Sequence, residues 1–192
     1  MMVVGISHVP SRFWKQIPED WRDLFDKSKI DEIDHLGGSD FQPSLNNVFR
    51  AFQLPINKVK IIIVGQDPYP NPDHAMGLAF SVPKEIAKLP PTLKNILKEL
   101  ETDLGILRKD GDLSDWCEQG VLLLNRTLTI GKNGINSHRD LGWQVITEHI
   151  VEELGREGKI GVLWGEDAKK LERYFEKDSL LQSAHPSPLS LS

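Results

Sequence analysis

Asp67, Asn125 and His185 carry side chains with useful chemistry, and each stands at or just after the end of a short apolar segment. An aspartate can act as a general base or stabilise a developing cation, and a histidine can donate a hydrogen bond to a developing anion. An asparagine amide places a donor beside an acceptor, which fits the edge of a nucleobase. Together these groups suit the cleavage of a bond between a sugar and a planar leaving group.

The apolar segments predict the elements that position these residues. Near-continuous runs rich in branched residues are typical of strands buried on both faces, as in a parallel sheet. Because parallel strands bring their carboxyl ends to one edge, we expect the three side chains to converge. The sequence predicts an α/β fold of three layers, α/β/α, around a central, mainly parallel four-stranded sheet. The predicted strands cover residues 59–64, 121–125, 160–165 and 180–184.

Amphipathic segments between and before the strands predict the helices. Two helices are expected to begin at Pro18 and Pro43, and their apolar faces contain aromatic residues. Pro90 and Pro91 are expected to prevent a helix before Thr92, whose hydroxyl can cap the next one. The later predicted helices cover residues 93–104, 141–154 and 166–175.

Composition narrows the classes of protein that need to be considered. A chain of 192 residues predicts one domain, expected to be a monomer. No run approaches the roughly 20 apolar residues of a membrane span, and no secretory signal is evident. The single cysteine, Cys117, excludes an internal disulfide and indicates a reducing compartment such as the cytoplasm. The net charge of −5 argues against non-specific coating of nucleic acid, although a site for a few phosphates stays possible.

Five motifs occur in a fixed order along the chain. They read GQDPYP at 65–70, GLAFSV at 77–82, PPTL at 90–93, LLLN at 122–125 and HPSPLS at 185–190. Together they resemble the motifs of the uracil-DNA glycosylases, family 1, and the match extends from about residue 21 to the last residue. The resemblance implies a DNA repair enzyme that flips uracil out of DNA and hydrolyses its N-glycosidic bond. Free uracil and an abasic site would be the products, and no cofactor or metal would be needed.

The resemblance also implies a role for each matched residue of the pocket. Asp67 would activate or position the water and stabilise the oxocarbenium-like sugar, and a neutral His185 would donate to uracil O2. Asn125 would read the O4 and N3 edge, which separates uracil from cytosine. Tyr69 would exclude the thymine methyl group, and Phe80 would stack on the base.

Contacts with the nucleic acid are implied for a second set of residues. The Gln66 backbone would touch the base, and Leu189 would enter the stack vacated by the flipped nucleotide. The implied partner is uracil-containing DNA, single- or double-stranded, with no membrane involved and a cytoplasmic location. The residues expected to hold the phosphates are Pro90, Pro91, Thr92, Gly165, Ser187 and Ser190.

Several positions depart from the family pattern. Pro70 stands where the central motif often ends in His, and Asn136 stands where many members have His. Glu166 replaces a frequent Ser, and a carboxylate beside a phosphate is unfavourable. Thr92 replaces a usual Ser but keeps the hydroxyl. The family usually continues for a few dozen residues after the last motif, so we expect a C-terminal end that is shortened relative to the family.

Two other functions fit parts of the sequence. A catalytically weak, family-related DNA-binding module is compatible with Glu166 and with the shortened C-terminal end, but it would not need both Asp67 and His185. A small-molecule α/β hydrolase could use these two residues, but Leu189 in its Pro-rich loop would have no purpose there.

Overall fold

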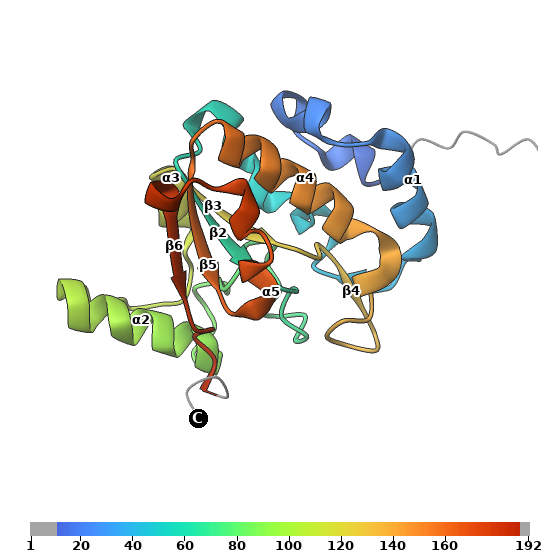
Figure 1. The fold of residues 1–192 in the computed structure, drawn as a ribbon. Helices are drawn as coiled ribbons and strands as arrows, with labels where there is room; N and C mark the ends of the chain where they lie inside the picture. Colours follow the sequence, from blue (N-terminus) through green and yellow to red (C-terminus); the bar gives the residue numbers. More distant parts are fainter. Residues whose placement is uncertain (1–10, 189–192) are drawn as a thin grey trace, which may run out of the picture.

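The structure, a computed structural model, describes residues 11–188 and centres on a four-stranded parallel sheet (Figure 1). The strand order is β3-β2-β5-β6, and all three neighbouring pairs are parallel. The predicted fold class, three-layer α/β/α around such a sheet, is confirmed. The strands are β2 (Ile61–Gly65), β3 (Val121–Asn125), β5 (Ile160–Trp164) and β6 (Leu180–Ser183).

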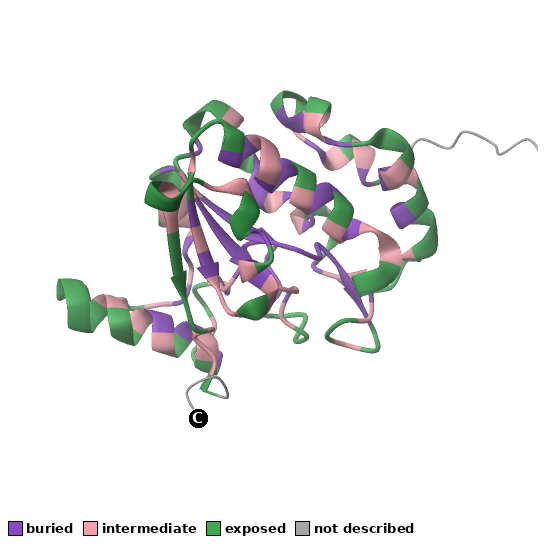
Figure 2. Cartoon of the chain, in the orientation of Figure 1, coloured by how far each residue is buried: buried purple, intermediate pink, exposed green. Residues whose placement is uncertain are grey.

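The inner strands are buried on both faces. Successive residues of a strand point to opposite faces of the sheet, yet residues 62–65 of β2 and 122–125 of β3 are all buried. Figure 2 shows these strands as a purple centre, with exposed helical surfaces outside. By contrast, β6 is an edge strand in which residues 181–183 are exposed. The rigid middle of the sheet therefore carries the residues that follow β2 and β3.

Helices pack around the sheet, and a short antiparallel ladder lies beside it (Figure 1). The longest helices are α2 (Pro91–Leu104) and α4 (Trp143–Arg156), of which α4 buries one face against the core. The remaining helices and the ladder are α1 (Lys27–Leu36), α3 (Ser114–Glu118), α5 (Glu166–Lys169), β1 (Phe41–Gln42) and β4 (Ile130–Gly131).

The two helices predicted to begin at Pro18 and Pro43 are wrong in type. The chain forms short 3-10 turns there, at Glu19–Leu24, Leu45–Asn47 and Arg50–Gln53. These turns still bury the predicted aromatic residues, and the Trp21 and Phe52 rings meet at 5.0 Å in an edge-to-face contact. Packing of large rings, and not helical periodicity, decides the backbone in this region.

Two helix boundaries also differ from the prediction. Helix α2 begins at Pro91, because a proline in the first turn of a helix loses no helical hydrogen bond. The predicted cap at Thr92 is therefore wrong, since Thr92 lies inside the first turn. Helix α5 ends at Lys169, and a 3-10 turn, Glu172–Tyr174, follows. The break seats the Phe175 ring against Gly161 of β5, where a Cβ atom would lie 2.7 Å from the ring. This tertiary contact overrides the continuous helix predicted for 166–175.

Candidate active site

A cavity of about 160 Å³ opens at the carboxyl edge of the sheet, beyond the ends of β2 and β3. Open α/β sheets bind their ligands at this edge. The convergence predicted from the strand pattern is therefore present. The residues that line the cavity include all six predicted to contact the base or the reacting bond: Gln66, Asp67, Tyr69, Phe80, Asn125 and His185.

The two carboxylate oxygens of Asp67 differ in their surroundings. Oδ2 accepts a hydrogen bond of 3.0 Å from the backbone N–H of Asn136. Oδ1 is buried and has no hydrogen-bond partner within residues 11–188. A buried carboxylate oxygen without a donor is costly unless a ligand or water satisfies it. One oxygen thus fixes the group, and the other is available to a water molecule or a developing cation.

Asn125 lies directly opposite Gly65 in the pairing of β3 with β2. A side chain at position 65 could not be accommodated, because a Cβ atom there would approach Asn125 Oδ1 to 2.4 Å. Asn125 is only 7% exposed, and no hydrogen bond within the described part of the chain involves its side-chain amide. A buried, unpartnered amide in a cavity wall has the groups needed to pair with a ligand that presents a donor and an acceptor side by side.

Tyr69 and Phe80 form the aromatic part of the cavity. The Tyr69 hydroxyl donates to the Phe80 carbonyl at 3.1 Å, and burial raises the pKa of the Tyr69 phenol. Phe80 has a φ of 65°, a backbone conformation that is rare for a residue with a bulky side chain. Residues in such strained conformations occur most often at functional sites. Its ring meets Trp164 edge-on at 5.3 Å. The Phe80 ring is therefore held in place by neighbours within the protein.

His185 reaches the cavity two residues after the end of β6. Its Nδ1 accepts a hydrogen bond of 3.1 Å from the backbone N–H of Ser187, so the neutral ring carries its proton on Nε2. Burial lowers the pKa of His185, which favours this neutral form. Gly165, with a φ of 84°, makes room for the ring, since a Cβ atom there would lie 2.8 Å from the His185 Cβ.

The residues predicted to hold DNA phosphates lie partly around the same cavity. Thr92 lines it, and Pro90 and Pro91 precede it at the start of α2. The Asn95 side chain donates to the Pro186 carbonyl at 2.8 Å, which ties α2 to the loop that carries Ser187. Leu189 and Ser190 lie outside the described residues.

The structure shows the surroundings of Glu166 and Pro70, two residues that depart from the family pattern. The side chain of Glu166 is 88% exposed and pairs with Lys169 at 3.0 Å, so its charge is partly compensated on its own helix. Pro70 lines the cavity as a stiff, exposed end of the central loop.

Clusters of metal-binding side chains do not occur in residues 11–188, where no three His, Cys, Asp or Glu residues are grouped to hold an ion. Over the same residues, no helix combines the length and apolar character needed to span a bilayer.

Three residues near the site were assigned no role from the sequence. Asn136 holds Asp67, Ile135 lines the cavity although its side chain is largely exposed, and Trp164 supports Phe80. Asn136 and Ile135 sit in a loop, where no strand end or periodicity marks them. For Trp164, the sequence indicated only a place near the end of a predicted strand, at residues 160–165.

Comparison with known proteins gives consistent matches. The family model of the Uracil DNA glycosylase superfamily matches residues 52–192. A uracil-DNA glycosylase of Nocardioides sp. is 48% identical over 156 residues, covering 80% of this chain and 68% of the relative. One from Campylobacter fetus subsp. fetus is 43% identical over 185 residues, covering 92% and 79%.

Solved structures agree with the sequence matches. The crystal structure of mimivirus uracil-DNA glycosylase superposes with a TM-score of 0.74 at 29% identity, covering 92% of this chain and 67% of that one. The enzyme from Nitratifractor salsuginis, at 22% identity and a TM-score of 0.66, shares the fold. The family matches and the relatives together show that this chain belongs to the uracil DNA glycosylase superfamily.

Proposed function

We propose that this protein is a DNA repair enzyme that hydrolyses the N-glycosidic bond of uracil in DNA, releasing free uracil and leaving an abasic site. One observation supports the proposal most strongly: four chemically suitable groups line one cavity of the size of a base. They are the unpartnered Asn125 amide, the Phe80 ring, the Asp67 carboxylate with one oxygen unbonded, and the neutral His185 imidazole. Membership of the superfamily points to the same reaction. A base inside a duplex cannot reach such a cavity, so the nucleotide must leave the stack.

Recognition of the base is assigned to three side chains. The Asn125 amide pairs with the O4 and N3 edge of uracil, where cytosine presents the opposite donor pattern. Phe80 stacks on the ring, and the Gln66 backbone borders it. Tyr69, held by its hydrogen bond to the Phe80 carbonyl, stands against C5 and excludes a methyl group.

The chemical step is assigned to Asp67 and His185. As the bond between C1′ of the sugar and N1 of uracil breaks, both electrons leave with the base, and positive charge develops on the sugar. Asp67 stabilises this charge and accepts a proton from the water whose oxygen bonds to C1′. The Nε2–H of neutral His185 donates to uracil O2, where negative charge accumulates, and no proton needs to transfer to the base.

Contacts with DNA complete the proposal. Backbone contacts and a wedge must offset the cost of unstacking, which is a few kcal/mol. We assign the wedge to Leu189 and the phosphate contacts to Pro90, Pro91, Thr92, Gly165, Ser187 and Ser190. We further propose that the protein acts as a monomer in the cytoplasm, where the single, partly buried Cys117 stays reduced.

The test uses an oligonucleotide that contains one uracil. The chain should release free uracil and leave an abasic site that is cleaved by alkali, with no release from a matched oligonucleotide that contains thymine or cytosine. Binding of the uracil oligonucleotide without release would favour the non-catalytic DNA-binding module. Absence of both binding and release would contradict the proposal.

A further inference from the structure

We propose that Asn136 is a positioning residue that sets the Asp67 carboxylate in its working orientation before DNA binds. The inference rests on the proposed function, because it concerns the step assigned to Asp67. Asn136 lies 69 residues beyond Asp67 in the sequence, yet its backbone N–H donates to Asp67 Oδ2 at 3.0 Å. Within residues 11–188, this N–H is the only hydrogen-bond donor to the Asp67 carboxylate, because Oδ1 has no partner there.

The backbone conformation of Asn136 is unusual. Its φ of 65° lies in the left-handed region, which asparagine tolerates better than other residues with a side chain. Rotation about φ turns the N–H relative to the chain that follows. The direction of the donor therefore depends on this conformation, provided that the following residues are fixed.

The following residues are fixed by the core. The Ser137 hydroxyl accepts from the Gly131 N–H at 2.8 Å. The buried His138 Nδ1 lies 2.9 Å from the Thr129 hydroxyl, which accepts from the Trp143 indole at 2.7 Å. Burial lowers the pKa of His138, so its Nδ1 is available as the acceptor of the Thr129 hydroxyl hydrogen. The position of Asn136 is thus fixed by groups that do not line the cavity.

The side chain of Asn136 adds a second link to the same loop. Its Oδ1 accepts a hydrogen bond of 2.9 Å from Gln66 Nε2. Asn136 therefore holds two consecutive residues of the central loop, one through its backbone and one through its amide. Holding Oδ2 in this way leaves Oδ1 for the water or the sugar cation, which is the preorganisation that catalysis by a fixed charge requires.

The first experiment separates the conformation from the side chain. Asn136→Val cannot adopt the left-handed conformation without strain, whereas Asn136→Gly keeps that conformation and loses only the amide. Asn133→Val is the matched control, because Asn133 is exposed in the same loop and has no positive φ. We expect Asn136→Val to lower kcat for uracil release about tenfold with KM within about twofold. Asn136→Gly should stay within about threefold of the unsubstituted chain, and the control should not change.

The second experiment tests the side-chain link by a double-mutant cycle. Gln66→Ala and Asn136→Gly each remove the same hydrogen bond, so the double variant should lose no more kcat than the more impaired single variant. Losses that multiply would show that the two side chains act independently and would remove the amide link from the proposal.

The outcomes distinguish this inference from the proposed function. If the unsubstituted chain releases uracil and Asn136→Val is equally active, the inference is wrong and the function stands. A rise in KM with unchanged kcat would also overturn it, since it would make Asn136 a DNA contact. If the unsubstituted chain releases no uracil, the proposed function fails, and the inference fails with it. The strained Asn136→Val variant should melt a few degrees lower than the others but stay folded at the assay temperature. Affinity for abasic product DNA should be equal among the variants, which excludes simple loss of folding.

Discussion

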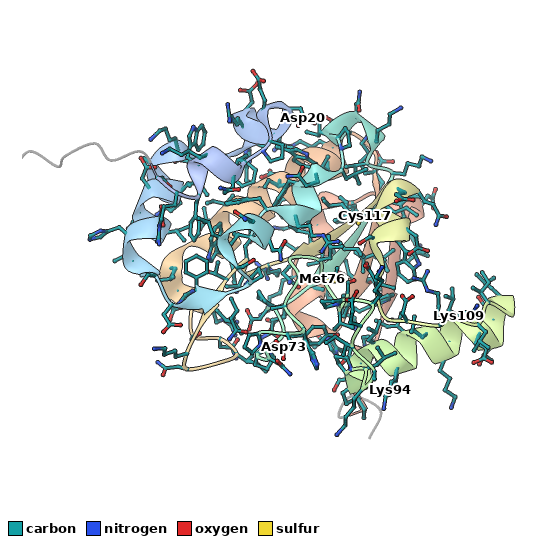
Figure 3. All side chains as sticks on the ribbon, turned by 180° about the vertical axis from the view of Figure 1, so that it is seen from behind. Asp20, Asp73, Met76, Lys94, Lys109 and Cys117 are labelled. Atoms are coloured by element: carbon teal, nitrogen blue, oxygen red, sulfur yellow. The ribbon has the colours of Figure 1, made fainter. Side chains whose placement is uncertain are left out.

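The two edges of the parallel sheet each carry a cavity, and they differ in what lines it. At the amino edge, a cavity of about 670 Å³ is lined by Arg50, Lys58 and Lys60, together with Cys117. At the carboxyl edge, the cavity of about 160 Å³ is smaller, but it is lined by short polar side chains and fixed rings. Figure 3 labels one residue of each cavity, Cys117 and Met76.

The difference lies in how tightly the polar groups are held. Lys58 and Lys60 are exposed and have long side chains with many rotamers, so using them for chemistry would require ordering them. Burial raises the pKa of Cys117 to about 11, which keeps it a thiol and a poor nucleophile. At the carboxyl edge, Asp67 and His185 are each oriented by a backbone N–H. The orientation of its polar groups, and not its volume, is therefore the reason for assigning the proposed reaction to the cavity at the carboxyl edge.

The largest expected effect of a single change is at Asp67. Asp67→Asn keeps the shape of the side chain but removes the charge to which we assign stabilisation of the transition state, so kcat for uracil release should fall about 10³-fold. Affinity for abasic product DNA should change little. The matched change at the other edge, Lys60→Ala, should leave kcat within about twofold. Comparable losses in both variants would abolish the distinction between the edges.

Selectivity should change most at Tyr69. Tyr69→Ala opens the space that we assign to C5 of the base, so the preference for uracil over thymine should fall about 100-fold, measured as a ratio of kcat/KM values. Lys58→Ala is the control at the amino edge. A Tyr69→Ala variant that folds but keeps full discrimination against thymine would show that another group excludes the methyl.

A smaller effect is expected at Gly165. Gly165→Ala introduces a Cβ atom 2.8 Å from the His185 Cβ, at a φ of 84°, and should lower kcat about tenfold. Gly158→Ala is a matched control, because Gly158 has a φ of 77° and no atom within 4 Å of an added Cβ. Both variants should lose about 1–2 kcal/mol of stability in a denaturant titration. Equal activity of the two would contradict the close approach to His185.

The pH dependence follows from the lowered pKa of His185. Burial favours the neutral ring, so the group is neutral at pH 7 and takes up a proton only as the pH falls below about 6.5, its usual value. Protonation of Nδ1 would remove the acceptor for the Ser187 N–H. Uracil release should therefore be flat above pH 7 and decline on the acid side. An NMR titration that finds an imidazolium at pH 8 would refute this assignment.

The smallest effect is expected at Cys117. Cys117→Ser should keep uracil release within about twofold, because the thiol lines the cavity at the amino edge, to which we assign no step of the reaction. With a pKa of about 11, Cys117 should also react slowly with iodoacetamide at pH 7 in the folded protein. Rapid alkylation that abolishes activity would mean that the two edges are coupled.

The carboxyl ends of the strands could be predicted from the sequence to within one residue, because their cause is local. A run of branched apolar residues that stops at a polar one fixes both the strand and the edge where Asp67 and Asn125 emerge. Asn136 could not be predicted as a partner of Asp67, since a loop conformation depends on distant anchors such as Trp143. The break after Lys169 was missed for a similar reason, because Phe175 packs on Gly161 of another element.

The most direct test of the difference between the edges is a crystal structure of the chain with free uracil. We predict that uracil occupies the carboxyl-edge cavity, with its ring on Phe80 and its O4 and N3 edge on the Asn125 amide. The amino-edge cavity should hold no uracil, despite its larger volume. Uracil bound among Arg50, Lys58 and Lys60, or bound at the carboxyl edge with its O4 and N3 edge away from Asn125, would contradict the account.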